Sequence, residues 1–190
     1  MTEIPKPSKE EVDKYIEKWK TLENYVNQEN SLNKLFLDLL PENKEIEDIL
    51  IKCSTLNDFY STNIFSIFPV AKHIHELNID DRLESGDLSL VEDIAYVEEL
   101  DKRFYSFASK YCSHHKPNDY PIFDNYVSRV LMHFKKKDKF AKFKMDDLRD
   151  YIRFNEVLDE FAKFYNLEEF TRKELDMYLW QLGKEYFARF

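Results

Sequence analysis

Glycine and proline are scarce in this chain, with only two glycines and six prolines in 190 residues. These residues form many of the tight turns that a sandwich or barrel of short strands requires. Apolar residues instead recur every three or four positions, as in Val12, Tyr15, Ile16 and Trp19. This spacing is typical of one buried helix face. The sequence therefore predicts an all-α fold of roughly eight to ten helices.

Local start signals support the helical interpretation. A serine or threonine followed three residues later by glutamate is a capping box, because each side chain can bond an unpaired amide of the first turn. The chain has this pattern at Ser8–Glu11, Ser89–Glu92 and Thr171–Glu174. Residues 54–69 fit either a buried helix or a short strand, interrupted at Pro69, and any minor strand pair is expected around residues 59–68.

The net charge of −9 is unevenly distributed. Residues 1–100 carry 10 Lys and Arg against 22 Asp and Glu, whereas residues 101–190 carry 18 against 15. A nucleic-acid-binding face is therefore expected only in the second half, and the acidic first half suits a protein partner. The overall acidity disfavours tight nonspecific binding to DNA, since phosphate contacts supply most of that affinity.

The cysteine content and hydropathy indicate a cytoplasmic protein. Cys53 and Cys112 are the only cysteines, and neither has the local spacing of a metal site. Residues 1–20 are polar throughout and do not resemble a signal peptide, and no apolar run approaches the ~18 residues of a membrane span. We expect no membrane association.

Two short motifs carry the strongest functional signal. The first places Lys110 behind two small residues, Ser106 and Ala108, and the second is Pro-Ile-Phe-Asp at residues 121–124, followed by Asn-Tyr-Val. Together they resemble the core of the helix-hairpin-helix DNA glycosylases, the endonuclease III and 8-oxoguanine glycosylase group. The resemblance implies one helical domain over residues 1–190, with a glycosylase-like core at residues 45–190 and the helices of residues 8–40 packed on it.

The resemblance implies that Lys110 is the catalytic nucleophile. In that family the lysine follows a Gly-x-Gly-x-Lys hairpin whose amides approach a DNA phosphate, and Ser106 and Ala108 stand here in place of the glycines. A neutral lysine amine can attack the sugar C1′ and form a Schiff base. The alternative is an ordinary solvated or snorkelling lysine in an unbroken helix over residues 101–115.

Asp124 corresponds to the family's aspartate at a helix N-terminus. There the carboxylate stabilises positive charge developing on the sugar or activates the nucleophile. Because aspartate is also a preferred N-cap, a purely structural role is the alternative, and both roles can hold together.

One lysine-rich segment is a candidate contact to the DNA backbone. Residues 133–144 contain six lysines and one aspartate. Lysines interleaved with aromatic residues suit phosphates and exposed bases, whereas in the alternative interpretation the phenylalanines anchor a charged loop to the core. The predicted contacts are Lys135, Lys136, Lys137, Lys139, Lys142 and Lys144.

Weaker predictions concern single residues. The stretch Leu50–Asp58 resembles an early family helix that reaches the opened duplex, which makes Asn57 a candidate DNA contact. Tyr111 and Trp180 are candidates to stack on an extruded base, although residues of either type are more often found in the core. The neighbouring His114 and His115 point to different helix faces and do not form a metal pair by themselves, so we expect no metal.

Two functions from different classes follow. The first is a base-excision-type DNA glycosylase that acts on damaged or modified DNA, with or without Schiff-base lyase activity, and needs no cofactor. The second is a non-catalytic helical scaffold that binds a protein or nucleotide partner.

Overall fold

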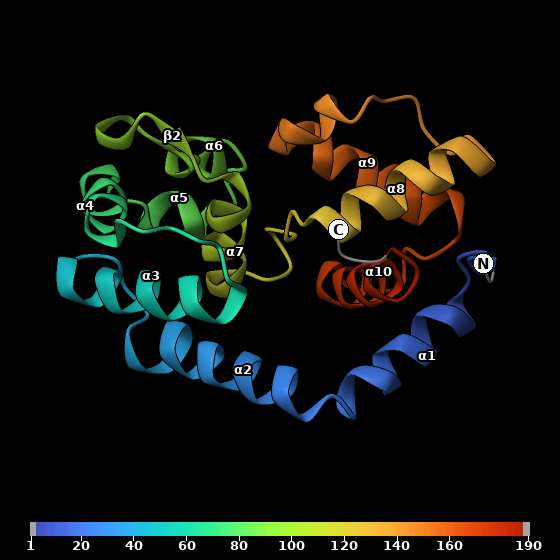
Figure 1. The fold of residues 1–190 in the computed structure, drawn as a ribbon, viewed down its shortest axis with the longest axis horizontal. Coiled ribbons are helices and arrows are strands. Elements are labelled where there is room, and N and C mark those ends of the chain that lie inside the picture. Colours follow the sequence, from blue (N-terminus) through green and yellow to red (C-terminus); the bar gives the residue numbers. More distant parts are fainter. Residues whose placement is uncertain (1–2, 188–190) are drawn as a thin grey trace. The chain divides into compact units, whose positions relative to one another are not determined.

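We describe the fold from a computed structural model, in which residues 3–187 are described. Within those residues it contains ten α-helices and a single sheet of two very short strands, so the all-α prediction is confirmed (Figure 1). The contacts divide the chain into two compact units. Unit 1 combines the residues up to Glu23 with those from Phe123 onward, and unit 2 comprises Asn24–Ile122.

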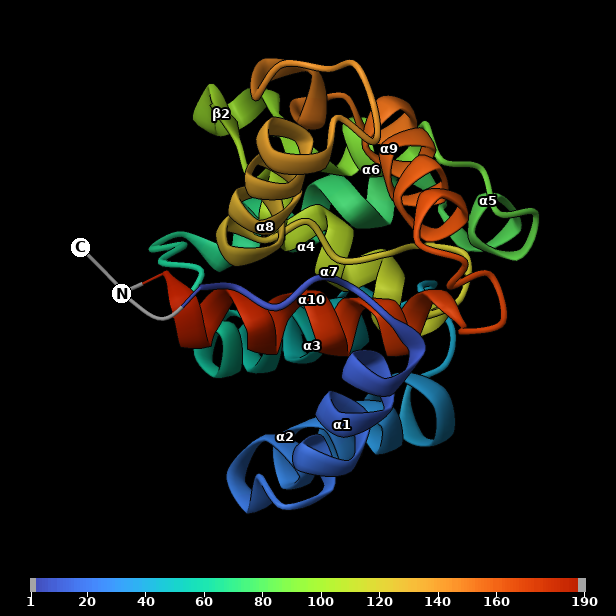
Figure 2. The same cartoon turned by 90° about the vertical axis from the view of Figure 1, so that its right-hand side faces the viewer.

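Unit 1 is a helical group built around the C-terminal helix. Its elements are α1 (Lys9–Lys20), α8 (Asn125–Asp138), the 3₁₀-helix η3 (Asp146–Arg149), α9 (Tyr151–Phe164) and α10 (Arg172–Tyr186). Helix α10 packs against both α1 and α8, and Figure 2 shows α1 beside α10. The core between these helices is rich in aromatic rings, including Tyr15, Phe134, Phe161 and Tyr178, all fully buried.

A glycine allows the close approach of α8 and α10. A Cβ atom added at Gly183 would lie 2.6 Å from Cβ and 2.8 Å from the carbonyl oxygen of Tyr126. Neither distance leaves room for a methyl group, because the second contact is to backbone. The absence of a side chain at Gly183 therefore sets the spacing of this helix pair.

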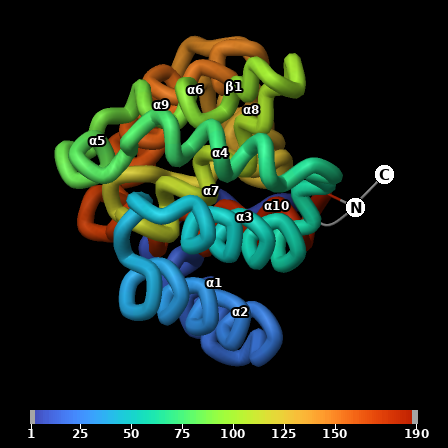
Figure 3. Tube along the Cα trace, turned by 90° about the vertical axis from the view of Figure 1, so that its left-hand side faces the viewer, coloured from blue at the N-terminus to red at the C-terminus, as the bar shows by residue number. Residues whose placement is uncertain are grey.

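Unit 2 contains the remaining elements. They are α2 (Glu23–Asn33), the π-helix η1 (Lys34–Leu39), α3 (Ile46–Tyr60), α4 (Ile67–Leu77), α5 (Asp80–Glu84), α6 (Leu90–Ala95), β1 (Tyr96–Val97), the 3₁₀-helix η2 (Glu98–Leu100), β2 (Lys102–Arg103) and α7 (Tyr105–His115). Helix α3 packs against α4 and α7, and α6 packs against α7 (Figure 3).

A small antiparallel hairpin joins α6 to α7. Strand β1 pairs with β2 so that Tyr96 lies opposite Arg103. The sequence placed a possible strand pair around residues 59–68, which is wrong, because residues 61–66 form a loop and Pro69 lies in the first turn of α4. Proline is tolerated there since first-turn amides have no partner within the helix.

The three predicted capping boxes differ in the structure. Thr171 and Glu174 form the complete reciprocal box at the start of α10. The Ser8 hydroxyl accepts a hydrogen bond from the Glu11 amide at 3.3 Å, which is half of a box. Ser89 makes no cap bond, because its hydroxyl donates instead to Asp87 Oδ1 at 2.6 Å. The prediction for Ser89 is therefore wrong.

Candidate functional site

Lys110 lies on α7 with its amine held inside unit 2. The residue is only 4% exposed. Its Nζ donates to the Ser106 hydroxyl at 2.5 Å and approaches the Ser106 carbonyl oxygen at 3.4 Å. Because residues four apart on a helix share one face, the α7 register itself brings these two side chains together. The solvated-lysine alternative is therefore wrong.

Two further side chains surround this lysine. Its Nζ lies over the ring of Tyr60, 5.2 Å from the centroid, and the Tyr60 hydroxyl is 2.9 Å from Nε2 of His114. His114 is 5% exposed and lies one turn after Lys110 on α7. The arrangement joins an amine, a serine hydroxyl, a phenol ring and an imidazole in one cluster, which we call the Lys110 cluster (Ser106, Lys110, Tyr60 and His114). Lys110 and His114 are buried, and Ser106 and Tyr60 are half-buried.

The predicted phosphate-binding turn at Ser106 and Ala108 is not present. Both residues lie within the first turns of α7. The Ala108 amide donates to the Phe104 carbonyl at 2.9 Å and its methyl group is fully buried. The Ser106 hydroxyl is engaged by Lys110. The Ala108 amide and the Ser106 hydroxyl are therefore both engaged within unit 2, and the two residues do not form the predicted hairpin turn.

Asp124 is the N-cap of α8. Its Oδ1 accepts a hydrogen bond from the Tyr126 amide at 2.7 Å, which confirms the capping role. Asp124 belongs to unit 1 and Lys110 to unit 2. The catalytic role of Asp124 stays a prediction.

The side chain of Asn57 shapes the loop after α3. Its Oδ1 accepts from the Thr62 hydroxyl at 2.6 Å and from the Ile64 amide at 2.9 Å, and its Nδ2 donates to the Ile64 carbonyl at 3.1 Å. The carbonyl oxygen and one of the two Nδ2 hydrogens therefore serve the loop, and the DNA contact of Asn57 stays a prediction.

The two candidate stacking residues occupy different environments. Tyr111 is fully buried, with its hydroxyl donating to Asn43 Oδ1 at 2.6 Å, and burial raises the pKa of this phenol well above its usual value. No face of its ring is open to a base, so that prediction is wrong. Trp180 is half-buried in unit 1, in an edge contact with Trp19 and beneath the Lys184 amine. Its stacking role stays a prediction.

The lysine-rich segment separates into a buried and an exposed set. Phe134, Phe140 and Phe143 lie in the core, so they anchor the segment and do not present rings to bases. Five of the six lysines are exposed, whereas Lys135 is half-buried with its amine over the Phe143 ring. Lys137 pairs with Glu3 at 2.8 Å. The exposed lysines of this segment can contact a phosphate backbone through their charge, but the segment offers no aromatic ring for stacking on bases.

A second polar cluster in unit 2 was not predicted from the sequence. Lys52 is fully buried, and its amine donates to Asn43 Oδ1 at 2.6 Å and to the carbonyls of Glu42 and Leu40 at 2.9 and 3.1 Å. These carbonyls follow the π-helix, so Lys52 satisfies acceptors at a helix C-terminus. Burial lowers the pKa of Lys52 to about 8, although Asp80 acts in the opposite direction.

His115 lies against the same cluster. Its Nε2 is 3.3 Å from Asn43 Nδ2 and 3.5 Å from Lys52 Nζ, both donors, so this nitrogen carries no proton. Burial, and next the Lys52 charge, lower the pKa of His115 to about 3. His114 and His115 therefore serve different clusters, although they are adjacent in sequence.

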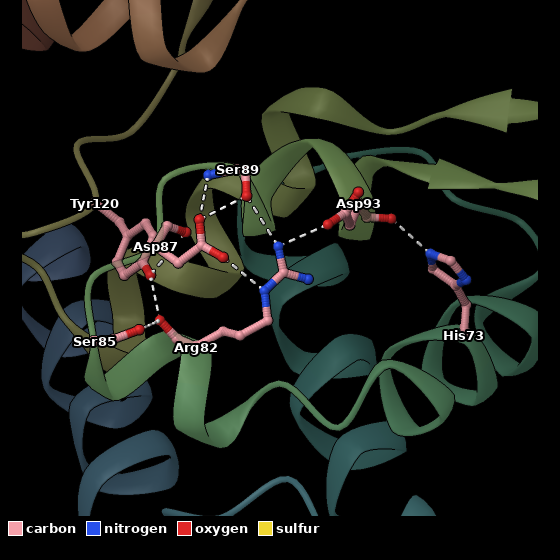
Figure 4. Close-up of polar contacts among 7 residues, drawn as sticks. All are labelled: His73, Arg82, Ser85, Asp87, Ser89, Asp93 and Tyr120. Atoms are coloured by element: carbon pink, nitrogen blue, oxygen red, sulfur yellow. Dashed lines mark hydrogen bonds and ion pairs between the residues drawn. The ribbon is translucent and has the colours of Figure 1, made fainter.

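An ion-pair network fixes the connection from α5 to α6 (Figure 4). Arg82 donates through Nε to Asp87 and through Nη2 to Asp93, each at 2.7 Å. The Tyr120 hydroxyl donates to the carbonyls of Arg82 and Asp87 at 3.1 and 3.2 Å, which ties the segment after α7 to this turn. His73 Nε2 reaches the Asp93 carbonyl at 2.7 Å. Because Arg82 pairs with two carboxylates, we assign it a structural role.

Within residues 3–187, no three His, Cys, Asp or Glu side chains are grouped as a metal site would require. Cys53 and Cys112 are buried thiols, not a disulfide, and burial raises the pKa of each. Among the described helices, none combines the length and apolarity needed to cross a membrane.

Comparison with known proteins assigns the family. The family model described as "HI_0787_N: N-terminal domain" matches residues 11–119, which is more than half of the chain. An uncharacterized protein of Haemophilus influenzae is 51% identical over 147 residues, covering 76% of this chain and 70% of the relative. The chain therefore belongs to the HI_0787_N family. No solved structure matches it. The matched residues include Lys110 and end before Asp124.

Proposed function

We propose that this protein is a base-excision-type DNA glycosylase with Schiff-base lyase activity, in which Lys110 is the nucleophile. The single observation that carries the proposal is the buried amine of Lys110 on α7. Ser106 of the same helix and Tyr60 at the end of α3 hold this amine in place. A buried, oriented lysine amine is the kind of group that covalent carbonyl chemistry uses. The absent hairpin glycines leave the resemblance partial.

The proposed step is chemically balanced. The lone pair of the neutral Lys110 amine forms a bond to the sugar C1′, and the N-glycosidic bond breaks with its electron pair leaving on the base, which takes up a proton. Opening of the sugar ring then gives an iminium ion between C1′ and Nζ. Borohydride adds hydride to this C=N bond and leaves a stable secondary amine, so the intermediate can be isolated.

In this proposal Asp124 stabilises positive charge on the sugar, while the exposed lysines of residues 136–144 contact the phosphate backbone. The charge distribution fits that assignment only for unit 1. Unit 1 carries 19 Lys and Arg against 19 Asp and Glu, whereas unit 2 carries 9 against 18. A cytoplasmic location also belongs to the proposal, since Cys53 and Cys112 are unpaired thiols of the kind that reducing compartments maintain.

The first test is borohydride trapping on labelled duplexes that carry uracil, 8-oxoguanine, an alkylated purine or an abasic site. We expect a covalent band with the wild-type protein, its loss in Lys110→Ala, and its retention in Lys34→Ala, a matched change at an exposed lysine of unit 2. Asp124→Asn should weaken the band without unfolding the protein. An undiminished band in Lys110→Ala overturns the nucleophile assignment.

One observation favours the scaffold alternative. The acidic excess of unit 2 is accompanied by internal pairing of its cations, including Arg82 with Asp87 and Arg103 with Glu92. A surface of this kind repels phosphates and suits a basic protein segment. Retention on immobilised DNA that falls with salt supports the glycosylase, whereas absence of retention at low salt supports the scaffold.

A further inference from the structure

We propose that Tyr60 is the positioning residue for the Lys110 amine and that His114 fixes Tyr60 in that role. The catalytic consequence rests on the proposed glycosylase function, whereas the positioning itself does not. All four groups of the Lys110 cluster belong to unit 2.

The backbone that carries Tyr60 is firmly held. Tyr60 is the last residue of α3, and Ser61 ends the helix in the left-handed conformation, with a φ of 49°. The chain then closes back on α3, because the Thr62 amide donates to the Asn57 carbonyl at 3.1 Å and the Asn57 side chain binds Thr62 and Ile64. Asn57 therefore holds the loop against the end of α3, and this contact fixes the position from which the Tyr60 side chain extends.

The ring of Tyr60 is fixed at its far end. Its hydroxyl and His114 Nε2 are 2.9 Å apart, and the two rings lie 5.7 Å from each other. His114 is itself packed against Phe36, with ring centroids 5.4 Å apart. A buried histidine with such a neighbour has little rotational freedom, so it orients the phenol.

The oriented ring then faces the amine. A lysine side chain has four rotatable bonds, and immobilising it costs conformational entropy. Here Ser106 restrains the amine through a hydrogen bond and Tyr60 through its ring face, 5.2 Å from Nζ. Contact with the ring face limits the positions open to the amine in either protonation state. Loss of the Tyr60 ring therefore removes a restraint from a side chain that must meet C1′ in one geometry.

The positioning can be measured without any substrate. In protein labelled with ¹³C-lysine, the εCH₂ proton signals of Lys110, assigned by their loss in Lys110→Arg, should lie upfield of those of an exposed lysine such as Lys34 because of the Tyr60 ring current. Tyr60→Leu should move them to the position of the Lys34 signals. Tyr60→Phe, which keeps the ring but not the hydroxyl, should leave a smaller, broader shift. The matched control is Tyr96→Leu, at an exposed tyrosine of the hairpin.

Unchanged Lys110 signals in Tyr60→Leu overturn the positioning role. Should Tyr60→Leu fail to fold, His114→Gln supplies the same test, since it removes the ring's partner and should broaden the Lys110 signals, and unaltered signals contradict the proposal. In the trapping assay we expect Tyr60→Leu to slow adduct formation about 10- to 100-fold while Tyr96→Leu does not. A wild-type protein that shows the shifted signals but traps no duplex refutes the glycosylase and leaves the positioning intact.

Discussion

His115, at the end of α7, should make the free energy of unfolding depend on pH in the acid range. His115 is held neutral beside Lys52, with its pKa lowered to about 3 from an ordinary value of 6.5. In the unfolded chain the same imidazole takes up a proton below pH 6.5. The unfolded state therefore binds more protons between pH 6.5 and 3, and the free energy of unfolding should decrease as the pH falls through this window.

We predict that His115 alone lowers the free energy of unfolding by about 1.4 kcal/mol for each pH unit below 6.5. His115→Gln keeps an acceptor for Asn43 and Lys52 but cannot be protonated, so it should flatten the pH dependence between 6.5 and 3. Urea unfolding at a series of pH values measures this effect, with His75→Gln as the control. Equal slopes in wild type and His115→Gln would contradict the assignment.

Lys52 should make the free energy of unfolding depend on pH in the alkaline range. Its pKa of about 8 in the folded protein lies below the ordinary 10.5, because burial disfavours the ammonium form. The unfolded state holds this proton up to pH 10.5 while the folded state releases it near 8, so the contribution of Lys52 to the free energy of unfolding should rise with pH between these values. We expect Lys52→Met to remove this rise in urea titrations at pH 7.5 and 9.5. A variant that retains it would exclude Lys52 as its source.

At the scale of the elements, the contact between α8 and α10 makes the sharpest prediction. Gly183→Ala places a methyl group against the backbone of Tyr126, and we expect a loss of about 1–3 kcal/mol in the free energy of unfolding because the helices must separate.

Gly86→Ala is the comparison for this change. Gly86 has a φ of +68° and open space around it, so its substitution costs only the left-handed backbone strain, about 1–2 kcal/mol. Thermal unfolding of both variants, together with crystal structures, separates the mechanisms: α8 and α10 should move apart only in Gly183→Ala. An unmoved helix pair in Gly183→Ala would show that the contact is not limiting.

Element starts and ends were partly predictable from the sequence. The Thr171–Glu174 box and the Asp124 cap are local signals in which one side chain meets an amide three residues away or fewer, and the structure contains both. Ser89 carries the same signal, but Asp87 competes for its hydroxyl. The hairpin at residues 96–103 gave no alternation to detect, since each strand has only two residues.

At the scale of the whole molecule, the helical class followed from composition and periodicity, whereas the environment of each polar residue did not. Lys52 looks like a surface lysine in the sequence, and a solvated lysine was the alternative for Lys110. Both are buried, because acceptors distant in sequence or a helical turn away lie beside their amines. Asn57 and Tyr111 were assigned to DNA, although the loop and the core use them. Helical periodicity identifies the apolar faces of helices, but it does not predict which polar side chains form buried hydrogen bonds.

The division into two units also bears on function. The predicted nucleophile lies in the strongly acidic unit 2, and the predicted charge stabiliser and the exposed lysines lie in unit 1. The family match covers mainly unit 2, which carries the predicted nucleophile.

Mass-spectrometric mapping of a borohydride-trapped protein–DNA adduct tests the central claim most directly. After trapping on an abasic-site duplex and digestion, the account predicts that the reduced sugar is attached to the peptide containing Lys110 and to no other lysine. An adduct at the exposed lysines of residues 136–144, or no adduct on any duplex, would contradict a catalytic role for the buried amine.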